Sequence, residues 1–558
     1  MKAGSVTIRN VPTGVPGLDE ILAGGLPEFS FNLVAGEPGA GKTTLTQQIV
    51  FANATVERPA LYFTLLGEPT LKLLRYQQQM SFFDRGRVGS AVQFINLSEE
   101  VLRGDLGLVL DRIAAEVERA RPGVVVVDSF RTVTGGSQEG RADPALERFI
   151  QGLALKLTSW EVTSFLVGEY QESELRNPVF TVADGVFWMS QSVDQNSVVR
   201  KIRVVKMRGR ASMPGLHTMR LTSDGVQVFP RTVIRAPAVE VRRPRHRLST
   251  GIAGLDDMMG GGVPAGDAVV LVGPTGSGKT AFATRFAAAG QEAGEASVIV
   301  VFEEHPRDYV ARARLLGLDL EAMQASGLVR LVYLRPLDLS PDEVLHEVRT
   351  QAREISAQRV IIDSLSGFRT ALAPTFRADF RESLYRLVAA LTAEGTTVWM
   401  TLEMESDRPL AFTPPEVAFL CDDIIVQRQV EVQGRLRNVL AVVKMRGSAH
   451  SHEIREYRIS EEGVRMLTTT PEFEGAFTGR TRLRSANRTL PGLTRQEHAV
   501  LRALEEEIAL TQVVAATGLE AAVAEAALRR LVTLGYAIER TPADGAPHLF
   551  RGAASART

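Results

Sequence analysis

The chain has 558 residues, 44% of them hydrophobic, which is enough for several buried cores and about three or four domains. Lys and Arg (64) balance Asp and Glu (65), so the net charge of -1 provides no overall attraction to nucleic acid or an anionic membrane. The single cysteine, Cys421, excludes an internal disulfide framework and a cysteine-rich metal site, and it indicates a reducing compartment. Without a signal peptide or a long apolar stretch, we expect a cytoplasmic protein with no membrane contact.

The first predicted strand, residues 31–35, leads into the phosphate-binding pattern GxxxxGK[ST]. The glycines let backbone N–H groups converge on phosphates, Lys42 reaches the β and γ oxygens, and the Thr43 hydroxyl can hold Mg²⁺. A later apolar run, residues 124–127, ends at Asp128, the candidate carboxylate on the Mg²⁺ side. The residues predicted to bind ATP are Gly36, Glu37, Pro38, Gly39, Ala40, Gly41, Lys42, Thr43 and Thr44.

The same pattern returns after a second predicted strand, residues 268–272, where Lys279 lies 237 residues beyond Lys42. Its predicted ATP-binding residues are Gly273, Pro274, Thr275, Gly276, Ser277, Gly278, Lys279, Thr280 and Ala281. The lead-ins ending at Asp19 and Asp256 keep the spacing of 237 residues, so the chain is a tandem duplication.

Continuous apolar runs such as 124–127 and 298–302 alternate with helical patterns, which is typical of buried parallel strands with crossover helices. The predicted fold class is therefore α/β, with two tandem phosphate-loop domains, mostly parallel sheets, and a small mainly α unit at the C-terminus. We expect the domains at 1–232, 248–468 and 492–553, joined by linkers at 233–247 and 469–491.

ATP hydrolysis also needs a group that orients water and a cation near the leaving charge. In the second half, Glu303 and Glu304 follow the strand 298–302 and can polarise the attacking water, while Thr280 and Asp363 can hold Mg²⁺. A solvated loop is the alternative interpretation of the two glutamates. In the first half the equivalent carboxylate is displaced by one position to Glu68, for which a catalytic role and a surface-loop role both remain open.

A Lys-Met-Arg-Gly sequence occurs once in each half, and its two cations have the spacing of side chains on one face of a strand. Each pair could address one phosphate; the alternative is an edge strand protected by charge. These candidate cations are Lys206, Arg208, Lys444 and Arg446.

The C-terminal unit has the pattern of a winged helix-turn-helix, with helices predicted at 494–506, 511–518 and 520–534 and a hairpin at 536–540 and 548–551. The third helix is alanine-rich, with Arg529 and Arg530 against Glu520 and Glu525. This balance favours protein docking or dimerisation, and DNA binding remains the alternative. The expected core residues are Leu501, Leu504, Val513, Val514, Leu528, Leu531, Val532 and Leu534.

Together the lead-ins, the two phosphate loops, the Phe302-Glu303-Glu304 loop and the doubled Lys-Met-Arg-Gly make the chain resemble the KaiC family over residues 5–465. The resemblance implies two RecA-like ATPase domains in a two-tiered hexameric ring, with ATP at subunit interfaces and the Lys-Met-Arg-Gly cations reaching the neighbour's γ-phosphate. Clock members of the family autophosphorylate a Ser-Thr pair, but Ala418 and Phe419 stand there in this chain. Thr413 is the nearby alternative acceptor.

We therefore expect a Mg²⁺-dependent ATPase, forming a homo-oligomer, that reports its nucleotide state to an unidentified signalling partner. The alternatives are an ATP-controlled DNA-binding regulator acting through the C-terminal unit, a RecA-like DNA motor, and a residual Ser/Thr autokinase. Salt-dependent DNA binding would favour the first two alternatives.

Overall fold

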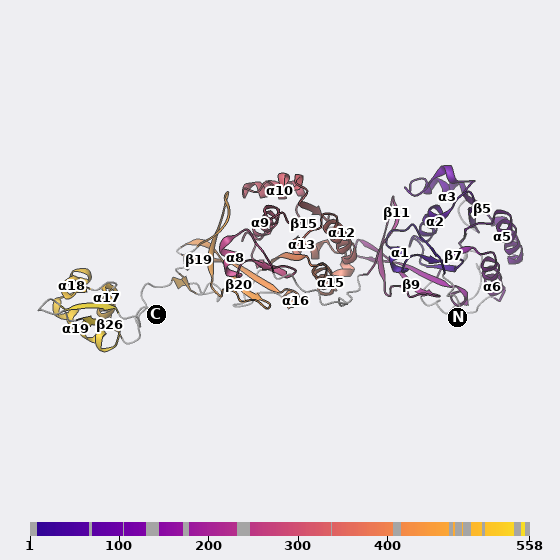
Figure 1. Cartoon of the computed structure of the whole chain (residues 1–558). Coiled ribbons are helices and arrows are strands. Elements are labelled where there is room, and N and C mark those ends of the chain that lie inside the picture. The colour runs from indigo at the N-terminus through magenta and orange to yellow at the C-terminus, as the bar shows by residue number, and fades with distance from the viewer. Residues whose placement is uncertain are drawn as a thin grey trace, which may run out of the picture. The chain divides into compact units, whose positions relative to one another are not determined.

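The computed structural model describes residues 8–65, 70–103, 105–129, 144–170, 178–231, 246–335, 338–404, 415–432, 434–467, 473–474, 482–483, 493–504, 508–540 and 548–552. The chain divides into two compact units: one consists of residues 1–405, 411–427 and 440–468, and the other of residues 406–410, 428–439 and 469–558. The first unit contains the first half of the repeat and most of the second, and each half folds as an α/β domain of its own (Figure 1). No helix among the described residues is long and apolar enough to cross a membrane.

The first half of the repeat folds around a nine-stranded sheet with the order β11-β10-β9-β8-β3-β7-β6-β4-β5. From β5 to β8 the strands are parallel, and the last three form antiparallel pairs. Its elements are β1 (Asn10–Val11), α1 (Leu18–Ile21), β2 (Leu26–Pro27), β3 (Phe31–Gly36), α2 (Lys42–Asn53), β4 (Ala60–Thr64), α3 (Thr70–Gln77), η1 (Arg85–Arg87), β5 (Val92–Asn96), α4 (Ser98–Leu102), α5 (Leu106–Ala120), β6 (Val124–Asp128), α6 (Pro144–Ser159), β7 (Thr163–Glu169), α7 (Pro178–Val182), β8 (Gly185–Asp194), β9 (Ser197–Met207), β10 (His217–Thr222) and β11 (Gly225–Phe229).

The second half repeats this sheet strand for strand, in the order β16-β15-β17-β18-β14-β19-β20-β21-β22. Its elements are β12 (Arg247–Leu248), α8 (Ala253–Met258), β13 (Val263–Pro264), β14 (Ala268–Gly273), α9 (Lys279–Glu292), β15 (Ser297–Val301), α10 (Pro306–Leu315), α11 (Leu320–Ala325), β16 (Val329–Tyr333), α12 (Pro341–Glu354), β17 (Arg359–Asp363), α13 (Leu365–Ala371), α14 (Pro374–Arg377), α15 (Phe380–Ala393), β18 (Thr397–Glu403), α16 (Pro415–Ala418), β19 (Asp423–Val432), β20 (Arg435–Met445), β21 (Arg455–Ser460) and β22 (Gly463–Met466). The predicted class, two tandem α/β domains with mostly parallel sheets, is confirmed.

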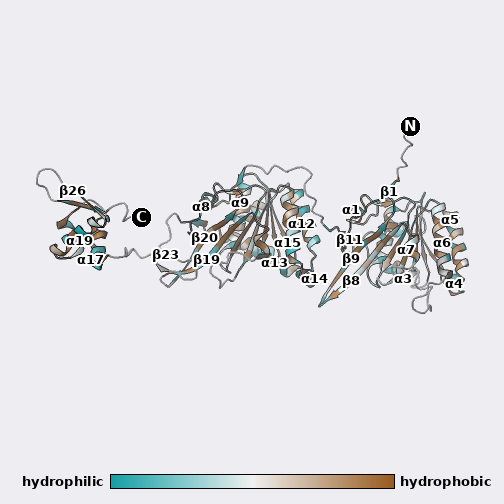
Figure 2. Ribbon diagram, turned by 90° about the horizontal axis from the view of Figure 1, so that it is seen from below, coloured by the Kyte–Doolittle hydropathy of each residue, from teal (hydrophilic) through white to brown (hydrophobic). Residues whose placement is uncertain are grey.

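The central strands are buried on both faces, as their continuous apolar sequences require. In β3, β6 and β14 every residue is buried except the last one of β6, and the hydropathy colours of Figure 2 show the same apolar strands in the middle of each sheet. Helix α2 packs on one face of the first sheet, and α5 and α6 supply core residues to the other. The carboxyl ends of the parallel strands therefore lie at one edge of each sheet, between two helical layers.

Most of the predicted linkers lie outside the described residues, and the domain boundaries remain predictions. Arg247, the last residue of the predicted first linker, is described: it pairs with Pro264 as the first residue of β12. Its guanidinium donates to the carbonyls of Met259 and Gly262 at 2.7 and 2.8 Å.

The C-terminal segment consists of β23 (Phe473–Glu474), β24 (Arg482–Leu483), α17 (Arg495–Ala503), β25 (Ile508–Ala509), α18 (Leu510–Thr517), α19 (Ala521–Thr533), β26 (Ala537–Arg540) and β27 (Leu549–Gly552). The helices fall where the sequence predicts them, and β25, which the sequence analysis missed, pairs with β27. Most of the expected core residues are buried or partly buried in one cluster. The expectation for Leu534 is wrong, because this residue follows the last turn of α19 and is 47% exposed.

Candidate active sites

The first phosphate loop connects β3 to α2, and two of its positions require glycine. A Cβ on Gly36 would lie 1.8 Å from the carbonyl oxygen of Met189, and Gly41 has φ +99° immediately before α2. The Lys42 ammonium donates to the carbonyls of Gly36 and Glu37 at 3.0 and 2.7 Å. Burial lowers the pKa of Lys42, while the carboxylates of Glu169, Asp128 and Glu37 oppose this shift. The loop thus presents a lysine and a helix N-terminus where phosphates would bind.

Asp128, the last residue of β6, accepts two hydrogen bonds on one carboxylate oxygen. Its Oδ2 receives the Thr43 hydroxyl at 2.8 Å and the Tyr62 hydroxyl at 2.5 Å. Burial raises the pKa of Asp128, and the bonds from Tyr62 and Thr43 act against that rise. The structure therefore brings together the two residues that the sequence assigns to Mg²⁺ in the first half.

The second phosphate loop has the same lysine geometry. Lys279 donates to the carbonyls of Gly273 and Pro274 at 3.0 and 2.8 Å, and burial lowers the pKa of its ammonium. Asp363 ends β17 and accepts the Thr401 hydroxyl at 2.5 Å. Thr280 is the second residue of α9, as Thr43 is of α2.

Glu303 and Glu304 follow β15, as predicted, but they have different surroundings. Burial raises the pKa of Glu303, and the carboxylates of Glu403 and Asp363 raise it further. The pKa of Glu304 is also raised by burial, but this residue forms an ion pair with Arg312. Asp363 raises the pKa of both glutamates, but only Glu304 has an arginine partner that opposes the rise. A carboxylate with a raised pKa and no such partner suits a group that takes a proton from water.

The sequence analysis missed a carboxylate in each site. Glu169 ends β7 opposite Gly36, and Glu403 ends β18 opposite Gly273, so each is level with the first residue of a phosphate loop. Glu169 is the largest favourable charge on Lys42, and Glu403 has the same relation to Lys279. Glu403 also accepts a hydrogen bond from Thr275. Both glutamates end apolar strands in corresponding positions of the repeat, and this signal could have revealed them.

Glu68 and Thr413 lie outside the described residues. No group of three or more His, Cys, Asp or Glu side chains in the described parts of the chain could hold a metal ion.

The Lys-Met-Arg-Gly cations form hydrogen bonds and ion pairs with residues outside both phosphate loops. Lys206 donates to the carbonyls of Thr181 and Ala183 at 2.9 and 2.6 Å, and Arg208 pairs with Asp184 at 3.1 Å. In the second half Lys444 donates to Cys421 at 2.6 Å, and Arg446 pairs with Asp422 at 3.3 Å. β9 and β20 each lie between two other strands, but the pairing of β9 with β10 is confined to residues 200–202, so the charged-edge alternative stays open for Lys206 and Arg208.

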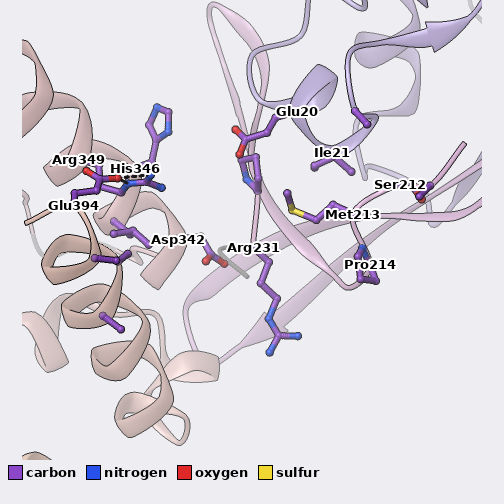
Figure 3. Close-up of a pocket in the computed structure, with 17 residues that line it drawn as sticks. Glu20, Ile21, Ser212, Met213, Pro214, Arg231, Asp342, His346, Arg349 and Glu394 are labelled. Atoms are coloured by element: carbon purple, nitrogen blue, oxygen red, sulfur yellow. Dashed lines mark hydrogen bonds and ion pairs between the residues drawn. The ribbon is translucent and has the colours of Figure 1, made fainter. Parts of the chain in front are cut away.

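The cavity in Figure 3 is separate from these sites. It has a volume of about 750 Å³, and none of its lining residues belongs to a phosphate loop. Arg349 on its wall donates to Glu394 at 2.9 and 2.6 Å, so this charge is already paired within the chain. We assign no ligand to this cavity.

Two mostly parallel sheets, each with a phosphate loop between its central strand and the following helix, define a tandem RecA-like P-loop ATPase. The chain belongs to the KaiC ATPase family, whose model matches residues 11–233 and 248–470. It is therefore an ATP-binding ATPase.

Named relatives support this assignment over most of the chain. It is 28% identical to the circadian clock oscillator protein KaiC of Picosynechococcus sp., across 85% of this chain and 92% of the relative. The identity to the protein of the same name from Rippkaea orientalis is also 28%, across 85% and 91% of the two chains. For the circadian clock oscillator protein KaiC 1 of Synechocystis sp. it is 27%, across 85% and 92%.

Proposed function

We propose that this ATPase works as a ring of chains, with six as the expected number, in which ATP lies between the phosphate loop of one chain and the Lys-Met-Arg-Gly cations of the next. The ring reports its nucleotide state to a protein partner. The observation that carries the proposal is the position of these cations at the opposite end of their own sheet.

Backbone hydrogen bonds define this position in the first half. Arg208 N donates to Asp184 O at 2.9 Å, and Asp184 N donates to Phe31 O at 2.8 Å, so Arg208 is level with the first residue of β3. The loop follows Gly36, five residues further along the strand, which is about 17 Å at the usual rise per residue. An arginine side chain does not span that distance, so Arg208 is out of reach of its own loop. Lys206 pairs with Val186, level with Leu33, and its ammonium is bonded away from the loop to the carbonyls of Thr181 and Ala183.

The second half repeats this arrangement. Arg446 N donates to Asp422 O at 3.0 Å, and Asp422 N donates to Ala268 O at 2.8 Å, again at the start of the strand that leads into the loop. For Lys206 and Lys444 a phosphate of a neighbouring chain would replace neutral carbonyls by a charged acceptor, and charge-assisted hydrogen bonds are stronger. Arg208 and Arg446 would exchange an aspartate partner for the phosphate. Lys206 and Arg208, and likewise Lys444 and Arg446, would then complete the neighbour's site.

Within each site the described residues supply the remaining groups. Thr43 and Asp128 in the first site, and Thr280 and Asp363 in the second, would hold Mg²⁺, which offsets the phosphate charge during hydrolysis. Glu303 would orient the attacking water and accept its proton, with Glu304 as the second candidate. Glu68 remains the proposed equivalent in the first site, beside the newly found Glu169.

ATP turnover measured together with light scattering tests the proposal. The variants are Lys42→Ala, Lys279→Ala, Glu303→Gln/Glu304→Gln and Lys444→Ala/Arg446→Ala. We expect the last variant to form the parent's assembly but lose second-site turnover. Parental turnover by a chain that remains a monomer would refute hydrolysis between chains, and ATP-dependent rings without turnover in the parent would indicate a nucleotide-gated scaffold.

Protein docking by the C-terminal unit is favoured over DNA binding by the pairing of its arginines. In α19 Arg529 pairs with Glu525 at 2.7 Å, and Arg530 pairs with Glu497 at 3.0 Å. Deleting the residues after Leu490 distinguishes the alternatives: a regulator that binds DNA through this unit would lose salt-dependent DNA binding and keep its ATPase activity, whereas a RecA-like motor would keep both. Autokinase activity requires transfer of labelled γ-phosphate to Thr413 or another hydroxyl.

A further inference from the structure

The second phosphate loop is hydrogen-bonded to two neighbouring strands through one residue, Ser277. The Ser277 hydroxyl donates to Gln427 Oε1 of β19 at 2.8 Å, and its carbonyl accepts the Tyr457 hydroxyl of β21 at 2.6 Å. Ser277 and Gln427 have no exposed surface, and Tyr457 is 1% exposed. Water therefore cannot replace these bonds without local opening, which makes them effective restraints.

The first loop has apolar residues at all three equivalent positions. Ala40 stands where Ser277 does, and Met189 and Met219 take the places of Gln427 and Tyr457. Strand pairing supports this equivalence: Gly36 is opposite Met189, and Val272 is opposite Val426, one residue before Gln427. The ends of both methionines lie 3.7 Å from the point where a Cβ on Gly41 would stand, so they pack against the loop without directional bonds.

Tyr457 links the loop to the helix that follows it. Its ring packs edge-on against Phe282 of α9, with centroids 5.2 Å apart, while its hydroxyl holds the loop two residues before Lys279. The loop conformation is in turn what directs backbone N–H groups at phosphate. A residue that fixes Ser277 therefore fixes part of the phosphate cradle.

We propose that Tyr457 and Gln427 are positioning residues for ATP, which hold the second phosphate loop in its binding conformation before the nucleotide arrives. The inference rests on the ATPase activity of the family and does not depend on ring assembly. The first loop lacks these buried bonds: besides the methionine packing, it accepts exposed bonds from Gln191 to Pro38 O at 3.1 Å and from Arg200 to Gly39 O at 3.4 Å, for which water competes. Preorganisation of this kind strengthens binding because less ordering is left to occur when the ligand binds.

Binding of a non-hydrolysable ATP analogue with Mg²⁺, measured by calorimetry, tests the proposal on the full-length chain. Every variant carries Lys42→Ala, so that only the second loop binds, and all comparisons are made within that background. We expect Tyr457→Phe and Gln427→Met each to weaken binding by about 3- to 10-fold, the usual effect of one buried hydrogen bond. Ser277→Ala should weaken binding at least as much as Gln427→Met, because it removes the bond to Gln427 and also the alternative bond of the Ser277 hydroxyl to Pro274 O at 2.8 Å.

Kinetics separate positioning from structural damage. Tyr457→Phe should raise KM for ATP and leave kcat close to that of its background, since the loop is restrained equally in the ground and transition states. The matched control is Tyr309→Phe. Tyr309 lies in α10, and its buried hydroxyl is hydrogen-bonded at 2.9 Å to Thr284 of α9, the helix that follows the loop. The change leaves the contacts of Ser277 with Gln427 and Tyr457 intact. The proposal would be overturned if Tyr457→Phe and Gln427→Met bound the analogue as tightly as the Lys42→Ala parent. It would also be overturned if Tyr309→Phe weakened binding as much as Tyr457→Phe does.

Discussion

Replacing Tyr62 by phenylalanine should weaken the first site through Asp128. The variant keeps the buried ring and removes only the hydroxyl, which donates to Asp128 Oδ2 at 2.5 Å. A hydrogen bond to a charged group contributes about 1.5–3 kcal/mol to the free energy of unfolding, and we expect a loss of that size in the first domain. Thr43 would then be the remaining donor of the pair at 2.8 Å.

The loss should depend on pH in a definite direction. Burial already raises the pKa of Asp128, and the Tyr62 bond opposes that rise, so the variant raises this pKa further. A carboxyl group whose pKa is raised by folding destabilises the folded chain only where it is ionised. The difference in free energy of unfolding between Tyr62→Phe and its parent should therefore be largest near pH 8. It should shrink as the pH falls toward the ordinary pKa of a carboxyl group, about 4.

Urea unfolding followed by tryptophan fluorescence measures this effect. In a Trp399→Phe background the remaining tryptophans, Trp160 and Trp188, both belong to the first half of the repeat. Tyr309→Phe in the same background is the control and should leave the first-half transition unchanged. Equal destabilisation of Tyr62→Phe at pH 8 and at about pH 4 would refute the reasoning, because the effect would then not depend on the ionisation of Asp128.

Three further changes test other parts of the structure. Glu403→Gln should shift the acid limb of second-site turnover to lower pH, because the Glu403 carboxylate is, after burial, the largest cause of the raised pKa of Glu303. An unchanged acid limb in the pH-rate profile would exclude Glu303 as the titrating base. Leu531→Ala, at a fully buried position of α19, should destabilise the C-terminal unit by about 2–5 kcal/mol, measured as protease susceptibility of that unit, with Leu534→Ala as the exposed control. Thr494→Ala removes the capping box of α17 and should cost about 1 kcal/mol by the same assay.

The parts that the sequence could predict depend on local patterns. The phosphate loops, Asp128 and Asp363 each follow a buried apolar strand, and the carboxyl ends of parallel strands necessarily meet at one edge of a sheet. Because the chain is a tandem duplication, each motif found in one half also predicted the position of its counterpart in the other half. Such patterns located the strands, the loops and the helices of the C-terminal unit to within a few residues.

The remaining features depend on pairing between distant segments. Glu169 and Glu403 reach the loops because β7 and β18 pair beside β3 and β14, and strand order is not visible in a single strand's composition. Glu303 and Glu304 look equivalent in sequence, but Arg312 on the next helix pairs with only one of them. The position of Arg208 and Arg446 at the far end of the sheet likewise follows from register, so sequence alone could not separate a chain's own loop from a neighbour's.

That separation of loop and cations has a genetic consequence. If sites are completed between chains, a chain with a damaged loop still offers intact cations, and a chain without cations still offers an intact loop. Two chains that are each inactive in the second site, Lys279→Ala and Lys444→Ala/Arg446→Ala, should then restore part of each other's second-site turnover when mixed. A single defective copy in a cell would also impair the sites of normal chains beside it, so that loss-of-function alleles behave as dominant ones.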